Sequence, residues 1–443
     1  MKEILERAAA SPAGKELAAA AASGEVAVLK GVSGSAYALY AAAVVERRGG
    51  VHIFVCGDRD AAAYLMNDFY NLLDEKQVYF FPSSYKRSVA YGAEDAQGVV
   101  QRTAAMNAVK GFTKGYLIVC TYPEALAERV ADAETLRRDT IAVKVGDSIS
   151  IAVLEDALVD ANFTRVDFVY EPGQYSVRGG IVDVFSFSES KPYRIDFFGD
   201  EVDSIRRFNI SSQLSADKLD RVEIIPNLNA GDGAAKVSFV QFAGDAAAYW
   251  FYDADYVLRR VNDIRRKTLA DMERPEEIDR LMTSRNALLG DLANCRMLAL
   301  RDNLPERPAT AAVEFDTAPQ PKFNKNFEML ADDMIRNSLR GYTTYILSEN
   351  KVQVERLENI FHQIGRGQAV VRPLSVTLHE GFVDNDLKLC LYTDHQIFDR
   401  YQRYRINGEI RRDEQMTVAE LNQLRPGDYV VHIDHGVGRF DGL

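Results

Sequence analysis

The stretch GQYSVRGGIVDVFSF at 173–187, followed by KPYRIDFFGDEVDSIRRFNISSQLS at 191–215, has the pattern of consecutive β-strands. Apolar and polar residues alternate along it, and Gly, Pro, Asn and Asp interrupt the alternation where turns are expected. The flanking segments IAVKVGDSISI and DRVEIIP are also β-type, and one helix is expected over Leu154–Asn162. The pattern predicts a small α+β domain at 139–225, inserted into the chain.

The chain before this domain alternates short β-rich runs with helical stretches, from Glu25 to about Val130. Such repetition is typical of a parallel sheet with helices on both faces. This part, 1–138, looks like a RecA-type nucleotide-binding half. Apolar spacing at 226–312 predicts a second, largely helical part of it. A further α/β domain is expected at 313–405, with a strand at Ala369–Arg372. The predicted fold class is therefore multidomain α/β.

Composition limits the classes of function. The apolar fraction of 47% is enough for several cores, and the net charge of −12 argues against a body that holds DNA through its phosphates. No apolar run is long enough for a membrane span. The four cysteines are widely spaced without a C-x-x-C pair, which favours buried, reduced thiols and a cytoplasmic protein.

A glycine-containing loop follows the first predicted strand, in the place where nucleotide-binding proteins cradle phosphate. A competent loop reads G-x-x-x-x-G-K-[ST], in which Lys neutralises phosphate and the hydroxyl holds magnesium. Here Gly31 and Gly34 are followed by Ala36, Tyr37 and Ala38 at the last three positions. The charge and the metal ligand are both missing, so we expect a degenerate loop, no nucleotide cofactor and no catalysis.

A second acidic motif, needed to support an ATP site, is not found elsewhere. The best match is Asp200 with Glu201, but Gly199 before them favours a turn between two antiparallel strands. We expect a hairpin there.

The quoted stretch resembles the second domain of the excinuclease subunit UvrB and of the transcription-repair coupling factor family, Mfd. The shared form is V-R-G-x-h-h-D-h-F, with h apolar, leading to F-F-G-D-E. Three features favour the coupling factor over UvrB. The phosphate loop is degenerate, YFFPSSYKRSVAYG leaves little room for a DNA-inserting hairpin, and LRPGDYVVHIDHGVGRFDGL at 424–443 is similar to the opening of a CarD-like RNA polymerase-interacting domain.

The resemblance implies a non-catalytic adaptor that recruits the repair protein UvrA, in a family whose full-length members are DNA-translocating ATPases. It places Arg178, Arg194 and Phe198 on the UvrA-binding surface. All three are then expected to be exposed on one side of the second domain, with Ile195 and Phe197 buried beneath. The alternatives are local salt bridges from Arg178 to Asp183 or Asp196, and core packing for Phe198.

The C-terminal part is expected to contain a linker at 406–417 and, from 418, the incomplete start of an SH3/Tudor-like β-domain that binds RNA polymerase. His432, Asp434 and His435 could ligate a metal, but strand-end packing is the favoured interpretation, so no metal is expected. The Arg and Tyr residues between Arg400 and Arg412 could contact DNA. A solvated linker is favoured, with weak or no DNA binding. An ATP-dependent DNA enzyme of UvrB type and a CarD-like regulator are the rival functions.

Overall fold

The computed structural model describes residues 1–85, 95–210, 212–228 and 235–400, together with 402, 405–406, 409–410, 427, 429–432 and 436–439. It forms two units, Met1–Tyr401 and Gln402–Leu443. Most of the expected linker and of the expected polymerase-binding domain lies outside the described residues. So do Asp434 and His435, and most of the Arg and Tyr run after Arg400.

The first part of the chain builds a seven-stranded sheet of order β17-β1-β16-β15-β2-β4-β3, in which every neighbouring pair is parallel. Its strands are β1 Val26–Lys30, β2 Gly50–Val55, β3 Val78–Phe81, β4 Tyr116–Thr121, β15 Ala248–Phe251, β16 Arg296–Ala299 and β17 Ala311–Glu314. The parallel sheet expected from the strand and helix repeat is confirmed.

Two strands of this sheet correct the largely helical assignment of 226–312. β15 and β16 come from that segment and lie side by side within the sheet. β15, with the sequence AYWF, is buried at every position. A strand buried on both faces shows no alternation of apolar and polar residues, so period-two reasoning misses it. The expected boundary at 312–313 also falls inside β17.

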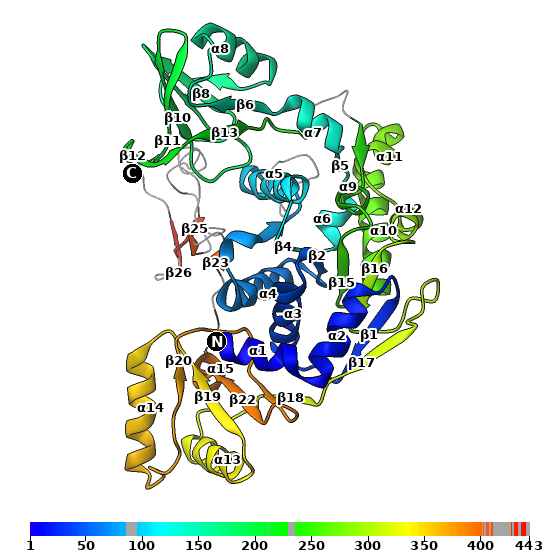
Figure 1. Ribbon diagram of the computed structural model, residues 1–443, viewed down its shortest axis with the longest axis vertical. Helices are drawn as coiled ribbons and strands as arrows, with labels where there is room; N and C mark the ends of the chain where they lie inside the picture. Colours follow the sequence, from blue (N-terminus) through cyan, green and yellow to red (C-terminus); the bar gives the residue numbers. More distant parts are fainter. Residues whose placement is uncertain are drawn as a thin grey trace. The chain divides into compact units, whose positions relative to one another are not determined.

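Helices cover the sheet, with α3 and α4 on one side and α10 and α12 on the other (Figure 1). The helices of this part are α1 Lys2–Ala10, α2 Pro12–Ala22, α3 Ala36–Arg48, α4 Arg59–Leu72, α5 Ala96–Gly111, α6 Pro123–Ala127, α7 Ala133–Asp139, α9 Phe239–Ala243, α10 Ala254–Asp271, α11 Ile278–Leu281 and α12 Arg285–Asp291. Asp58 and Asp253 cap α4 and α10 through their side chains. Ser35, at the start of α3, makes no such cap.

The chain passes from the seven-stranded part into the α+β module and back again, and two antiparallel strand pairs hold these crossings together. β5 Val130–Ala131 pairs with β14 Lys236–Val237, and β6 Ile141–Lys144 pairs with β13 Arg221–Ile224. Between them lie α8 Ile151–Asp160, β7 Thr164–Arg165, β8 Gln174–Arg178, β9 Ile181–Val184, β10 Tyr193–Phe198, β11 Glu201–Phe208 and β12 Ser215–Leu219. We call the residues from β6 to β13 the inserted module.

The inserted module has its own sheet, of order β12-β11-β10-β9-β8-β7, and its own core. Leu154 and Leu158 of α8 pack against Val182 of β9 and Ile195 of β10, all of them fully buried. Burying each such side chain contributes about 1.5–3 kcal/mol. The single helix and the short strands are therefore held together by a continuous apolar layer.

A third, five-stranded sheet of order β18-β21-β22-β19-β20 follows. Its elements are β18 Thr317–Pro319, α13 Phe327–Leu339, β19 Thr343–Leu347, α14 Lys351–Gln363, β20 Pro373–Leu374, β21 Phe382–Asp384, β22 Leu389–Thr393 and α15 Asp394–Ile397. The expected strand at Ala369–Arg372 is wrong, because the strand here is the two-residue β20 just after it. Pro373 lacks a backbone N–H, which suits an edge strand.

The described residues of the second unit form two short antiparallel hairpins. β23 Arg405–Ile406 pairs with β24 Glu409–Ile410, and β25 Tyr429–His432 pairs with β26 Gly436–Arg439. All four cysteines of the chain are free and buried, as expected. None of the described helices is long and apolar enough to cross a membrane.

Candidate partner-binding surface

The acidic pair Asp200 and Glu201 lies at a β-hairpin, as the sequence predicts. β10 and β11 are antiparallel, and Phe198 pairs directly with Glu201, leaving a turn of two residues. Gly199 has φ +64°, a conformation that a residue with a Cβ seldom adopts. The tight turn projects Phe198 from the end of the sheet.

The register places a row of polar side chains on one face of the inserted module. Arg194 of β10 is the direct neighbour of Asp183 in β9 and of Arg206 in β11. Cross-strand neighbours point to the same face. Ile195 and Val182, one position along, line the core instead. We call the face that carries Arg178, Asp183, Arg194, Asp196, Phe198 and Arg206 the outer face.

Asp183 joins the two predicted arginines. Its carboxylate is 1% exposed and accepts hydrogen bonds from Arg194 Nε at 2.8 Å and Nη2 at 2.9 Å. Arg178 Nη2 donates to the same carboxylate. This fork geometry fixes the guanidinium planes, and charge-assisted bonds of this kind are stronger than neutral ones. The local salt bridge considered for Arg178 is therefore present, with Asp183 as its partner.

Exposure differs among the three predicted surface residues. Phe198 is 84% exposed, so core packing is excluded for it. The Arg178 side chain is 35% exposed, whereas that of Arg194 is only 16% exposed, which corrects the expectation that all three are open to solvent. Beneath them Ile195 is fully buried, as expected, but Phe197 is partly buried at the margin of the core.

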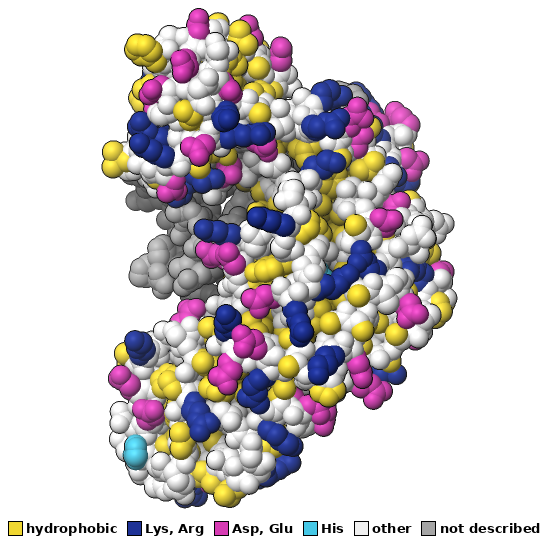
Figure 2. Space-filling view, in the orientation of Figure 1, with side chains coloured by type: hydrophobic (Ala, Val, Ile, Leu, Met, Phe, Trp, Pro, Cys, Tyr) yellow, Lys and Arg dark blue, Asp and Glu magenta, His cyan; other side chains and the backbone are white. Residues whose placement is uncertain are grey.

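Exposed apolar side chains lie near these arginines. Phe168 is 48% exposed, and the Arg178 guanidinium lies 4.8 Å from the centre of its ring. Arg194 is placed similarly over Phe208, at 4.5 Å, but that ring is buried. Figure 2 shows Lys and Arg side chains on the visible side of the inserted module, with hydrophobic and acidic side chains among them. Arginine beside exposed aromatic rings is a composition typical of protein interfaces.

Arg206 is a member of the outer face that sequence reasoning missed. Strict alternation from Glu201 would turn Arg206 toward the core. The register of β10 with β11 shifts between Asp196 and Phe197, so that Asp203 has no direct partner and Ser204 pairs with Asp196. This bulge moves Ile205 into the core and Arg206 onto the outer face. A β-bulge leaves no clear mark in a single sequence.

The degenerate loop forms a sharp turn between β1 and α3. Gly31 has φ +73°, and a Cβ there would lie 2.1 Å from the carbonyl oxygen of Phe315. Ser33 N donates to Thr317 Oγ1 at 2.8 Å, so the loop is fastened to the segment that follows β17. A tight turn therefore leads from β1 into α3, without the lysine and the hydroxyl that a competent phosphate loop carries at positions 37 and 38.

The side chain at the lysine position points into an apolar cluster. The Tyr37 ring packs edge-on against Phe54 and Trp250, with centroids 6.1 Å and 6.3 Å away. Burial raises the pKa of Tyr37 well above its ordinary value. The neighbouring Ala36 and Ala38 are buried too. The three positions therefore serve packing, and they supply neither the lysine charge nor the serine or threonine hydroxyl of a competent loop.

The mouth of the loop is occupied by other parts of the chain. Asp68 Oδ2 accepts a hydrogen bond from Ser35 Oγ at 2.6 Å, and Asp68 Oδ1 accepts one from His379 N at 2.6 Å. Ser35 Oγ also accepts from Glu380 N at 3.0 Å, and Ser35 N donates to Glu380 O at 3.2 Å. Asp68 and the backbone of Glu380 thus lie at the start of α3, where a competent phosphate loop would hold phosphate.

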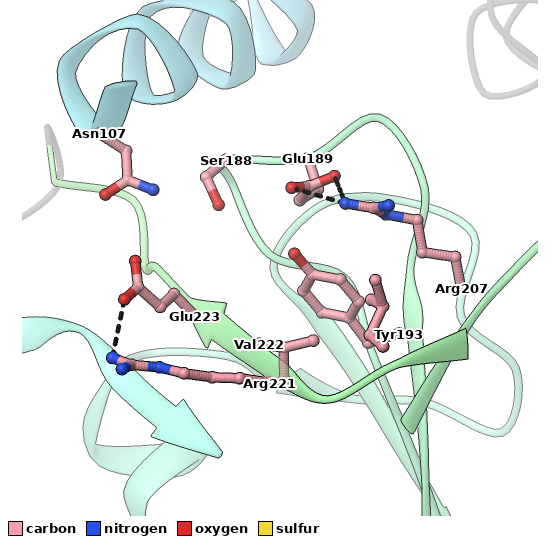
Figure 3. Close-up of a pocket in the computed structure, with 9 residues that line it drawn as sticks. Asn107, Ser188, Glu189, Tyr193, Arg207, Arg221, Val222 and Glu223 are labelled. Atoms are coloured by element: carbon pink, nitrogen blue, oxygen red, sulfur yellow. Dashed lines mark hydrogen bonds and ion pairs between the residues drawn. The ribbon is translucent and has the colours of Figure 1, made fainter. Parts of the chain in front are cut away.

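A polar pocket of about 280 Å³ lies at the base of the inserted module, near Asn107 of α5 (Figure 3). Its charges are paired with one another. Arg207 lies 3.2 Å from Glu189, and Arg221 lies 2.9 Å from Glu223. Within the described residues, no group of three or more His, Cys, Asp or Glu could hold a metal ion.

Comparison with known proteins supplies the family context. Residues 141–229 match the UvrB interaction domain, and residues 424–443 match the CarD-like/TRCF RID domain. The transcription-repair-coupling factor of Bacillus subtilis is 23% identical over 94% of this chain and 42% of its own length. That of Escherichia coli K12 is 23% identical over 95% and 42%, and one from Staphylococcus epidermidis is 23% identical over 85% and 38%. The chain therefore spans about two fifths of the length of these curated relatives.

Proposed function

We propose that this chain, which is the N-terminal region of a transcription-repair coupling factor, is a non-catalytic adaptor that recruits UvrA to RNA polymerase stalled at a lesion. UvrA would bind the outer face of the inserted module. RNA polymerase would bind through the domain whose start matches residues 424–443. The site of action would be the cytoplasm, with little or no DNA held by this region.

The observation that carries the proposal is the arrangement around Asp183. Two arginines share one buried carboxylate, and an 84% exposed phenylalanine projects from the next strand. Covering an exposed aromatic ring with a partner surface makes the free energy of binding more favourable. Guanidiniums held in place beside the ring recognise carboxylates with defined geometry. Interface energies usually concentrate on such residues.

The proposal also treats the seven-stranded part as a RecA-like, UvrB-like domain that no longer binds nucleotide. Asp68, Glu380 and the packed Tyr37 ring support this, because each removes or opposes a group that ATP requires. The third sheet would act as a structural neighbour of that domain. Its Glu380 backbone already bonds to Ser35.

The experiment is a binding titration of the whole chain with purified UvrA, followed by Phe198→Ala and Arg178→Ala. Loss of a central aromatic or arginine anchor typically costs about 2 kcal/mol or more, which is a loss of roughly thirtyfold in affinity. The matched control is Leu339→Ala, because Leu339 is 85% exposed but lies on α13, outside the inserted module. Normal UvrA binding by Phe198→Ala and Arg178→Ala would reject the proposed function.

A further inference from the structure

The three arginines of the outer face differ in how many of their donors are already engaged. Arg194 uses Nε and Nη2 on Asp183 and Nη1 on the Gln213 carbonyl, at 3.2 Å. Arg178 uses Nη2 on Asp183 and Nη1 on the Asp167 carbonyl. Since a guanidinium has five N–H donors in a fixed fork, Arg194 has few left to offer outward.

Arg206 is engaged much less. Its described contacts both come from Nη2, which donates to Ser204 Oγ at 3.1 Å and lies 3.6 Å from Asp196 Oδ2. Its Nε is buried without a hydrogen-bond partner among the described residues. The side chain is 35% exposed, which equals Arg178 and exceeds Arg194. An unsatisfied buried donor costs about 1–3 kcal/mol, so a small movement toward an incoming acceptor is favourable.

The surroundings of Arg206 indicate an acidic ligand. Lys218 of β12 is its direct cross-strand neighbour, and that side chain is exposed. Two like charges placed directly opposite each other destabilise a sheet. Asp196, which lies 3.6 Å from Arg206 Nη2 and also accepts the Ser204 hydroxyl at 2.7 Å, is one carboxylate beside two cations. The Arg206 and Lys218 pair is therefore incompletely neutralised within its own module.

From this we infer that Arg206 is a further partner-contact residue, which binds a carboxylate-bearing segment of the partner together with Lys218, while Arg194 is chiefly a positioning residue that orients Asp183 and Arg178. This rests on the proposed function and extends it. The contact surface then runs from Phe198 at the hairpin to Lys218 at the other end of the outer face.

The test is a UvrA titration of the whole chain carrying Arg206→Ala or Lys218→Ala, at two salt concentrations. Arg206→Ala is expected to weaken binding at least tenfold at low salt, and Lys218→Ala two- to fivefold. The fall in affinity with added salt should become shallower in both, because a screened charge contact has been removed. Thermal unfolding should change little, since exposed ion pairs contribute little to stability.

The matched control is Arg207→Ala, one residue along the same strand. Arg207 pairs with Tyr193 in the register, faces the pocket side and contacts Glu189, so its loss should leave UvrA affinity within about twofold. Wild-type affinity of Arg206→Ala, with binding lost in Arg178→Ala, would overturn this inference and leave the proposed function standing. Unchanged binding in Arg178→Ala and Phe198→Ala as well would overturn the proposed function itself.

Discussion

Asp68 and Ser35 are joined by a 2.6 Å hydrogen bond across the mouth of the degenerate loop. Ser35 stands at the start of α3, where its hydroxyl could cap the helix, but it bonds to Asp68 instead. The carboxylate also accepts the His379 backbone N–H, which ties the loop to the segment before β21. The N-terminus of α3, a place where helices can bind anions, therefore lies against a carboxylate of the chain itself.

The first prediction is that the chain does not bind ATP, and that Tyr37→Lys does not restore binding. Lysine at 37 would bury an ammonium where the tyrosine ring packs on Phe54 and Trp250. The mouth would still hold Asp68. We expect Tyr37→Lys to lower stability by about 2–4 kcal/mol, as large core disruptions do. Calorimetry with ATP and Mg²⁺, alongside thermal unfolding, measures both. Micromolar ATP affinity in the unmodified chain would contradict the prediction.

The second prediction concerns the pH dependence of Asp68. Burial raises the pKa of Asp68 to about 7, with the charge of Glu380 adding to the effect. Because the folded-state pKa lies above the unfolded one, the stabilisation from this group is complete below about pH 4 and is lost as pH rises through about 7. Asp68→Asn mimics the neutral acid and removes the dependence. We expect the free energy of unfolding of the unmodified chain, relative to Asp68→Asn, to fall between pH 5 and pH 8.

Urea unfolding of both proteins at pH 5 and pH 8 provides the measurement. Between pH 5 and pH 8 the shift limits the change to about 3 kcal/mol, and relaxation of the site will reduce it. Asp74→Asn is a suitable control, since Asp74 is an exposed carboxylate before the short helix at 75–77. Parallel pH profiles for Asp68→Asn and the unmodified chain would show that Asp68 is ionised in both states.

The degenerate loop shows how far sequence reasoning reaches. The missing Lys and hydroxyl are local substitutions at Tyr37 and Ala38. The sequence alone is therefore enough to predict that this loop does not bind nucleotide, and the ATP titration tests that prediction. The contacts that His379 and Glu380 make at the loop could not be predicted, because these residues lie more than 300 residues away in the chain. Long-range contacts between loops leave no periodic pattern to detect.

The third prediction concerns His52, which is fully buried in β2. Its Nδ1 accepts from Trp250 Nε1 at 3.1 Å, so Nε2 carries the proton and donates to the Gly49 carbonyl at 3.1 Å. Burial lowers the pKa of His52 to about 4. The neutral ring therefore stabilises the fold above about pH 6.5, and this contribution is lost as pH falls through about 4.

His52→Gln keeps an acceptor and a donor without the titration. We expect the unmodified chain to lose up to about 3 kcal/mol relative to His52→Gln between pH 6.5 and pH 4. Differential scanning calorimetry across this range gives the comparison, with His362→Gln as the control on the last turn of α14. Equal acid sensitivity of His52→Gln and the unmodified chain would contradict the prediction.

The outer face was predictable only in part. Alternation placed Arg194, Asp196 and Phe198 on one side of β10 correctly, because that strand is regular. It could not place Arg206, since the bulge at Asp203 reverses the alternation in β11. It also could not reveal that Arg194 is enclosed, because its contacts with Phe208 and the Gln213 carbonyl form only once β11 and its following loop are folded. The sequence therefore predicts which residue types lie on each side of β10. The solvent exposure of Arg194 depends on contacts that form only in the assembled sheet.

The last prediction separates Arg194 from Arg178 by stability. Asp183 is 1% exposed, so any unpaired charge on it is costly. Arg178→Ala leaves Asp183 with the two-pronged contact of Arg194 and should cost less than about 1 kcal/mol. Arg194→Ala removes both hydrogen bonds to Asp183, the contact with the Gln213 carbonyl and the stacking on Phe208. It should lower the free energy of unfolding by about 2–4 kcal/mol.

Urea unfolding should therefore give a clearly lower midpoint for Arg194→Ala and a nearly unchanged one for Arg178→Ala, although both weaken UvrA binding. Adding Asp183→Asn to Arg194→Ala should recover part of the lost stability, because the buried charge is removed along with its partner. It should not recover UvrA binding, since the amide no longer orients Arg178 by charge. Equal stability of the two single variants would mean that Arg178 and Arg194 neutralise Asp183 equally, and Arg194 would then lose its assignment as a positioning residue.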